Sequence, residues 1–443
     1  MKNKIITLII TAVFFGCADQ LDIAPVNSVE SSSALKTSKD VEALLVGAYA
    51  LLGDGDVLGG NMQRDAELIG DDGEMFWDGT FVDPGQIFIK KLLITNGQAE
   101  LTWLEAYETI NAANTVLNNL NVVVSTKKDK VEGEAKFIRA LTHFELVRVY
   151  AKTYTDGNPA NNPGIPLALT PDNLEPLNRS TVQQVYTQII QDLTDAVNLL
   201  PETNGFFATT YTASAILSRV YLMQNDYAKA RDAAHRVIAS GKYSLLSDYA
   251  NNFNNSSNGS SNATAEDVFS IQVTNQAGIN NMNTFFASSD FGGRGDIYVE
   301  PAHLALYDPA DERLALFYDD ERTGKWNNQF GNVNIVRLSE MYLTRAEGNF
   351  REGTALGQAP LDDINFIRNR AGLTTPLASV TIDDILLERH LELAFEGHLI
   401  HDIKRTQRSV GALPYNDPSL VFPIPNRERL INSGLVQNEG YGN

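Results

Sequence analysis

The sequence predicts a mainly α-helical fold with minor β structure, built on a scaffold of helix pairs. Apolar side chains recur at intervals of three and four residues through most of the chain, which is typical of amphipathic helices. Two helical segments, 212–224 and 226–240, meet at a tight turn, and two others, 336–352 and 359–371, are joined through glycines. Short joints of this kind favour neighbouring helices that pack against each other.

The first half of the chain begins with a clear helix start. Thr37 and Asp40 have capping-box spacing, and Val41, Leu45 and Ala48 follow at helical intervals. The predicted elements are, in order, a helix from about 37 to 52, a loop with short extended pieces at 54–97, helices at 98–122 and 131–153, a Pro/Asn/Gly loop at 156–166, and a helix capped near 180 that runs to 201.

The second half opens with the pair 212–224 and 226–240, whose facing Ala side chains make it similar to a tetratricopeptide unit. An Asn- and Ser-rich stretch at 250–266 predicts a flexible loop. Alternation over 268–273 predicts a strand, and 274–330 is irregular and aromatic, so it is the candidate for an inserted binding region. A capping box at 381–384 predicts the longest helix, ending near Arg408.

The N-terminus predicts export and lipidation. Lys2 and Lys4 precede an apolar stretch at 5–15, which is too short for the ~20 residues of a membrane-spanning helix. Gly16 followed by Cys17 makes the segment similar to a lipoprotein signal, although Phe14 and Phe15 are atypical before the glycine. We expect a signal peptide at 1–16 and a tether at 17–36 that is lipidated on Cys17. The alternatives are an ordinary cleaved signal or a buried thiol.

Composition excludes several classes of partner. The formal net charge is −20, from 35 Lys and Arg against 55 Asp and Glu, so binding to nucleic acid or to anionic head groups through a basic patch is not expected. Cys17 is the single cysteine, which excludes intramolecular disulfides.

Several segments occur in an order that is similar to a known family. They are WLEAYETINAAN at 103–114, GEAKFIRA at 133–140, RLSEMYLTRAE at 337–347, INFIRNRAG at 364–372, ERHLELAFEGH at 388–398 and FPIP at 422–425. Over nearly the whole mature chain, this order resembles the SusD/RagB family of Bacteroidetes outer-membrane lipoproteins.

The resemblance implies a single domain at 37–443, with an N-terminal part at about 37–225, a C-terminal part at about 226–443 and a variable lobe at about 250–330. It implies about four tetratricopeptide-like helix pairs. It also implies a cell-surface, non-catalytic protein that binds oligosaccharides, or peptides in some branches, as the lid of a SusC-like TonB-dependent transporter. No cofactor is expected.

Two charged patterns offer alternatives to this interpretation. Glu388, Glu392 and Glu396 share one helical face and could suit a glycoside hydrolase. We expect them instead to be structural and paired with the nearby basic side chains Arg389, Lys404 and Arg405. His398 and His401 lack the zinc-protease spacing, and the acidic loops at 54–56 and 71–74 lack EF-hand spacing, so we expect no metal.

Sugar binding requires flat apolar surfaces and convergent polar groups. Trp103 lies on an amphipathic helix and is expected in the core. Trp77 and Trp326 lie in polar surroundings, and exposure of their rings for stacking is predicted; the alternative is that each anchors its loop on the scaffold. The further candidates are Tyr298, Phe291, Arg294, Asp72 and Arg64.

Overall fold

The computed structural model describes residues 35–171, 176–255, 264–276, 278–319 and 321–442. The predicted mainly helical class is confirmed. The helices are α2 (Ser38–Leu52), α3 (Asn61–Gly70), α4 (Val82–Phe88), α5 (Gly97–Asn118), α6 (Ser125–Tyr150), α7 (Val182–Leu199), α8 (Thr210–Met223), α9 (Tyr227–Ala239), α10 (Asn281–Phe286), α11 (Pro301–Leu304), α12 (Leu338–Glu352), α13 (Pro360–Arg370), α14 (Ile382–Leu393), α15 (Leu399–Arg405) and α16 (Asn426–Ile431).

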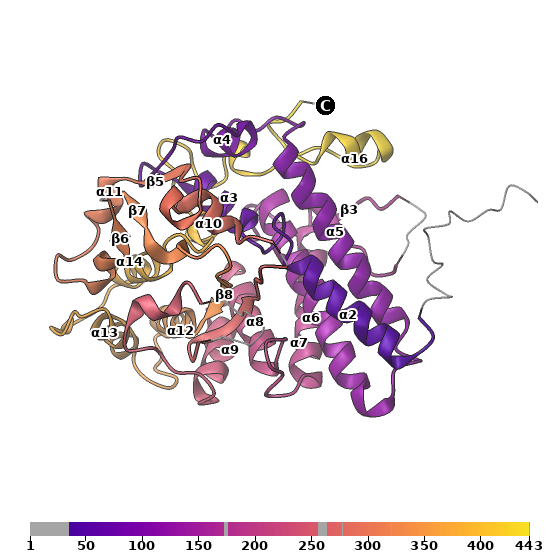
Figure 1. The fold of residues 1–443 in the computed structure, drawn as a ribbon, viewed down its shortest axis with the longest axis horizontal. Helices are drawn as coiled ribbons and strands as arrows, with labels where there is room; N and C mark the ends of the chain where they lie inside the picture. Colours follow the sequence, from indigo (N-terminus) through magenta and orange to yellow (C-terminus); the bar gives the residue numbers. More distant parts are fainter. Residues whose placement is uncertain (1–34, 172–175, 256–263, 277, 320, 443) are drawn as a thin grey trace, which may run out of the picture.

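The long helices form one continuous layer, in which α5 packs on α6, α6 on α7, α7 on α8, α8 on α9, α9 on α12, and α12 on α13 and α14 (Figure 1). The ends of several helices are determined by residues close to them in the sequence. Capping boxes at Thr37 and Thr181 open α2 and α7, and Gly353 ends α12 in the left-handed conformation. Trp103 is buried between Tyr107 and Tyr150, so its predicted place in the core is confirmed.

Within the described residues, the short strands form four antiparallel pairs. They are β1 (Met75–Trp77) with β5 (Ile297–Val299), β2 (Pro163–Pro166) with β3 (Arg179–Thr181), β4 (Asp267–Ile271) with β8 (Val333–Arg337), and β6 (Phe317–Tyr318) with β7 (Arg322–Thr323). Strand β4 confirms the strand predicted at 268–273. Strands β5, β6 and β7 lie with α10 and α11 in a lobe at the opposite end of the molecule from α2 and α5 (Figure 1).

The prediction of a loop with only short extended pieces at 54–97 is wrong, because α3 and α4 lie within it. All ten residues of α3 are buried, including Gln63, Arg64 and Glu67. Half of the residues of α3 are polar or charged, so its sequence gives no sign that the helix is enclosed on every side.

The single long helix predicted from 381 to 408 is also wrong. It is interrupted between α14 and α15, where Phe395 and Gly397 have φ angles of 62° and 87°. Polar side chains from elsewhere satisfy the backbone at this break. Lys325 Nζ donates to the carbonyl oxygen of Ala394 (2.8 Å), and a carboxylate oxygen of Glu67 accepts from the N–H of Gly397 (2.7 Å).

The flexible loop predicted at 250–266 is wrong at its ends, and 256–263 lie outside the described residues. Asn252 and Phe253 are buried at one end, and Glu266 is fully buried and ion-paired at the other.

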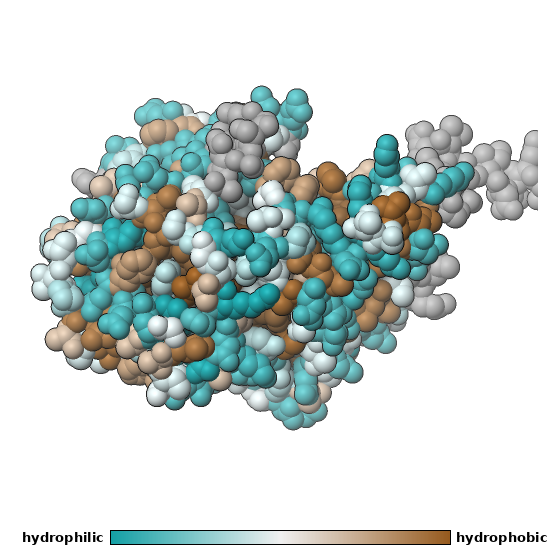
Figure 2. Space-filling view, turned by 90° about the horizontal axis from the view of Figure 1, so that it is seen from below, coloured by the Kyte–Doolittle hydropathy of each residue, from teal (hydrophilic) through white to brown (hydrophobic). Residues whose placement is uncertain are grey.

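The predicted signal peptide and Cys17 also lie outside the described residues. Within the described part of the chain, no helix is long and apolar enough to span a bilayer. The face drawn in Figure 2 mixes hydrophilic and apolar side chains, with the apolar ones in separate small groups, as is usual for a surface in contact with water.

Candidate functional site

The pairing of β1 with β5 places two aromatic side chains side by side on the outer face of a small sheet. Phe76 lies directly opposite Tyr298 in the register. Alternation along a strand sends neighbouring side chains to opposite faces, and the neighbours of both residues are buried. Phe76 is therefore 48% exposed, and Tyr298 is half-buried beside it.

The β6–β7 hairpin extends this surface. The Arg322 guanidinium lies 4.2 Å from the centre of the Tyr298 ring, and Arg322 Nη1 donates to the carbonyl oxygen of Gly295 at 3.1 Å. Tyr318 lies opposite Arg322 in the hairpin, and Phe291 contacts the Tyr318 ring edge to face at 5.4 Å. At the other end, Phe88 contacts Phe76 at 6.3 Å. We call this set the aromatic row: Phe88, Phe76, Tyr298, Arg322, Tyr318 and Phe291.

A second exposed ring lies near the β1–β5 sheet. Phe81 is 48% exposed, and the guanidinium of Arg294 lies 4.4 Å from its ring centre. Arg294 is held by Asp296, which accepts from its Nε at 2.8 Å, and by the hydroxyl of Thr80 at 3.2 Å. Each of the two places thus combines an aromatic ring with a guanidinium donor held by other groups, which is a combination that suits a sugar ring.

Two of the predicted residues, Tyr298 and Phe291, belong to the aromatic row, and a third, Arg294, lies over Phe81. The exposure predicted for Trp326 is wrong, because the side chain is 2% exposed and its indole Nε1 donates to the carbonyl oxygen of Phe395 at 3.0 Å. Its neighbour Lys325 is buried as well and donates to Ala394 and Glu396 at the α14–α15 break. Trp326 therefore anchors its segment on the scaffold.

Trp77 is also buried, since it faces inward from β1 and packs against Phe285 at a ring distance of 6.0 Å. The prediction that it is exposed is therefore wrong. Arg64 is fully buried on α3, where its Nη1 and Nη2 donate to Asn61 and Gln98, so it cannot reach a ligand at the surface. Asp72 is exposed and lines a separate cavity.

The three glutamates of the 388–396 pattern are buried, as a structural role requires, but the predicted partners are wrong. Arg389 pairs with Glu340 and Asp402, Arg405 pairs with Glu347 and Asp402, and Lys404 donates to the carbonyl oxygen of Leu420. The actual partners come from distant segments: Arg313 and Arg368 for Glu388, Arg313, Arg337 and Arg370 for Glu392, and Lys325 and Arg337 for Glu396.

This network of glutamates and basic side chains is buried away from water. Burial lowers the pKa of Lys325 to about 8, although the carboxylate of Glu396 at 2.7 Å opposes that shift. A glycosidase needs carboxyl groups that reach the scissile bond, and these carboxyl groups face guanidinium and ammonium groups inside the protein.

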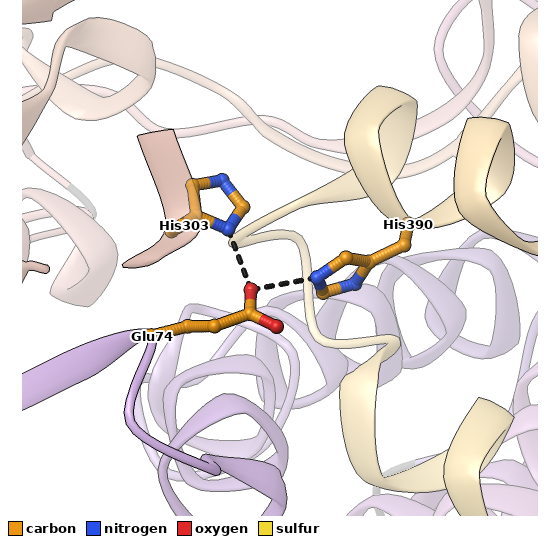
Figure 3. Close-up of side chains that lie close together, drawn as sticks. All are labelled: Glu74, His303 and His390. Carbon is orange, nitrogen blue, oxygen red and sulfur yellow. Dashed lines mark hydrogen bonds and ion pairs between the residues drawn. The ribbon is translucent and has the colours of Figure 1, made fainter. Parts of the chain in front are cut away.

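A cavity of about 190 Å³ lies beside α14 and α15, and Asp72, Glu74 and His390 contribute to its wall. Glu74 precedes β1, and its Oε2 lies 2.6 Å from Nδ1 of His303 on α11 and 2.7 Å from Nε2 of His390 on α14 (Figure 3). Burial alone would raise the pKa of Glu74, but the bonds to the two imidazoles outweigh burial and lower it. Of the histidines considered from the sequence, His398 also lines this cavity, and His401 is buried on α15.

Two family models match the chain. A model described as starch-binding and associating with the outer membrane matches residues 21–222, and the SusD family model matches residues 312–413, so together they cover more than half of the sequence. The chain belongs to the SusD/RagB family.

Relatives of this SusD/RagB protein match all or part of its length. SusD-like protein P2 of Formosa agariphila is 26% identical, and the alignment covers 99% of this chain and all of that protein. The starch-binding protein SusD of Bacteroides thetaiotaomicron is 34% identical over 125 residues, which are 25% of this chain and 22% of that protein. A crystal structure of a SusD superfamily protein from Bacteroides vulgatus has a TM-score of 0.81 at 26% identity, covering 92% and 100% of the two chains.

In this SusD/RagB protein, sequence reasoning missed Phe76, Phe81, Phe88, Tyr318 and Arg322. Phe76 stands between Met75 and Trp77, so three consecutive apolar residues give no sign of which one faces outward. Tyr298 lies between Ile297 and Val299 in the same way, so the outward direction of both rings becomes clear only once β1 is known to pair with β5.

Proposed function

We propose that this SusD/RagB protein binds oligosaccharides at the outer membrane through the aromatic row and the neighbouring Phe81–Arg294 pair. The observation that carries the proposal is the pairing of Phe76 with Tyr298 on an exposed sheet face, with Arg322 held over the Tyr298 ring. The description of the first family model as starch-binding, and the name of the starch-binding relative, support a carbohydrate as ligand.

The mechanism is non-covalent. Ring faces of Phe76, Tyr298 and Phe291 pack on the C–H faces of sugars, and the guanidinium groups of Arg322 and Arg294 donate to hydroxyl groups. Each ring that is desolvated contributes ~1–3 kcal/mol, so a few together give micromolar binding, about −8 kcal/mol. An open surface with exposed rings favours an oligosaccharide over the peptide that is the alternative ligand within the family.

The proposal places the domain at the cell surface, anchored by a lipid on Cys17 and closing over a SusC-like TonB-dependent transporter. Residues 1–16 would be the signal peptide, and 17–36 the tether. The main core cluster runs from Val41 to Leu435, which supports a single domain over 37–443. The ion-paired burial of Glu388, Glu392 and Glu396 supports a non-catalytic role.

Calorimetric titration with maltoheptaose, together with a glycan array, tests the binding site. Phe76→Ala and Phe291→Ala are each expected to weaken glycan affinity about tenfold, which corresponds to ~1.4 kcal/mol. Phe350→Ala is the matched control, because this ring on α12 is 38% exposed and outside the row. Equal affinity in all three variants would reject the site. Release of reducing sugar from a glycan that the array identifies would reject the non-catalytic role.

A further inference from the structure

We infer that Glu74, His303 and His390 form a binding site for a divalent transition metal, with Zn²⁺ as the preferred ion. The three ligand atoms lie within 4.8 Å of one another, and within the described residues this is the one group of three or more such side chains close enough to share an ion. Figure 3 shows both imidazoles directed at the same carboxylate oxygen.

The chemistry of the donors favours a borderline metal. Two imidazole nitrogens and one carboxylate oxygen are a common ligand set for catalytic or open zinc sites, whereas Ca²⁺ and Mg²⁺ prefer oxygen donors throughout. Ligands of a tetrahedral zinc at ~2.0–2.2 Å lie roughly 3.4 Å apart. The present spacings of 2.6 and 2.7 Å would open by less than ~1 Å, and the side chains of Glu74 and His390 are each 24% exposed at the cavity and have room to move.

The surroundings of His303 orient its ring as a metal ligand. The Tyr307 hydroxyl has one proton, which it donates to the carbonyl oxygen of Leu391 at 3.2 Å. The same oxygen must therefore accept from Nε2–H of His303, 3.3 Å away. A neutral His303 then carries its lone pair on Nδ1, the atom that faces the carboxylate of Glu74.

Two lone pairs cannot face each other at 2.6 Å unless a cation lies between them. That cation is either a second proton on the imidazole or a metal ion. A ligating histidine usually donates its other N–H to a fixed acceptor, and Tyr307 supplies that acceptor here. The arrangement is thus prepared for metal on the buried side of the site.

The opposite side is open to a fourth ligand. Glu74 and His390 line the cavity of about 190 Å³, which has room for water at the open coordination position. The charge of the lining also favours a cation, since the carboxylates of Asp72, Glu74 and Asp402 outnumber the guanidinium groups of Arg389 and Arg408.

A metal here would connect the sheet of the aromatic row to the C-terminal helices. Glu74 lies two residues before Phe76, and His303 lies five residues after Tyr298, so the ion would tie both strands to α14 through His390. The metal would stabilise the β1–β5 sheet whether or not that sheet binds a glycan. The metal site and the proposed function can therefore be refuted independently of each other.

Calorimetric titration of the full chain carrying Cys17→Ser tests the site without the thiol as a competing ligand. Zn²⁺ is expected to bind with 1:1 stoichiometry, and Mg²⁺ is the control ion. Glu74→Gln and His390→Gln are each expected to lower the Zn²⁺ affinity at least tenfold. His235→Gln, on α9 and away from the cavity, should leave it unchanged. Co²⁺ should give visible absorption bands of a four- or five-coordinate site in the parent chain, and these bands should be lost in both site variants.

Thermal unfolding adds a second readout, because an ion that binds only the folded state raises the melting temperature. Zn²⁺ should raise it in the parent chain and in His235→Gln, but not in Glu74→Gln or His390→Gln. Circular dichroism of each variant checks that it is folded. Absence of Zn²⁺ binding to the folded parent chain, or affinity that neither site variant changes, would overturn the inference and leave a proton between His303 and Glu74.

Discussion

Replacing Glu67 by Gln should change the pH dependence of stability. Glu67 is buried on α3 and accepts from the N–H groups of Gly397 and His398 at 2.7 and 2.9 Å. Burial raises its pKa from 4.5 to about 7, although these backbone donors oppose the shift. Glutamine keeps an acceptor oxygen for the same N–H groups and does not ionise.

Between pH 4.5 and about 7, the unfolded chain has lost the Glu67 proton while the folded chain still holds it. The free energy of unfolding therefore falls as pH rises through this window. At ~1.4 kcal/mol for each pH unit, the fall amounts to about 3 kcal/mol and is complete above about pH 7. Glu67→Gln lacks this contribution, so wild type should lose about 3 kcal/mol relative to the variant between pH 4.5 and 8.

Urea unfolding of both proteins at intervals from pH 4.5 to 8 measures this difference. Glu108→Gln, at an exposed position on α5, is the control and should differ from wild type by less than about 0.5 kcal/mol at every pH. A difference between wild type and Glu67→Gln that stays constant, or that grows in favour of wild type as pH rises, would refute the reasoning.

Three further predictions concern stability, and denaturant unfolding measures each. Arg337→Met should lower the free energy of unfolding by ~3–5 kcal/mol, because it removes the buried partner of three carboxylates. Arg408→Ala, at an exposed ion pair, should lower it by less than ~1 kcal/mol. Similar losses in the two variants would contradict this prediction. Trp326→Ala should cost ~3–5 kcal/mol through the cavity it leaves, and a neutral result would mean that the ring is not core. Gly397→Ala should cost at least ~1–3 kcal/mol, since φ is 87° and a Cβ would lie 2.8 Å from the backbone of Gln63; unchanged stability would argue against the break.

Local sequence was sufficient to predict features, such as helix ends, that depend on residues close together in the chain. The capping boxes at Thr37 and Thr181 and the glycine at 353 give helix ends that the structure confirms, because the atoms involved lie within a few residues of one another. The family could also be identified from short segments such as 337–347 and 388–398, because these contain paired charged residues and core residues of the C-terminal half.

Local patterns failed where a segment is enclosed by distant parts of the chain. Half of the residues of helix α3 are polar or charged, yet other elements cover all of it. The predicted 381–408 helix breaks where Lys325 and Glu67 form hydrogen bonds with its backbone. The predicted exposure of Trp77 and Trp326 failed for the same reason, because polar neighbours in sequence do not determine which residues cover a ring in space.

The sequence by itself therefore determined the helical class, the starts of most of the long helices and the family. Only the tertiary structure decided which aromatic side chains reach the surface, and only it brought Glu74, His303 and His390 together across separations of 229 and 316 residues. The physical reason is the range of the interactions. Caps and amphipathic faces act within a few turns of chain, whereas exposure and ligand clusters depend on contacts between segments that meet only in the folded protein.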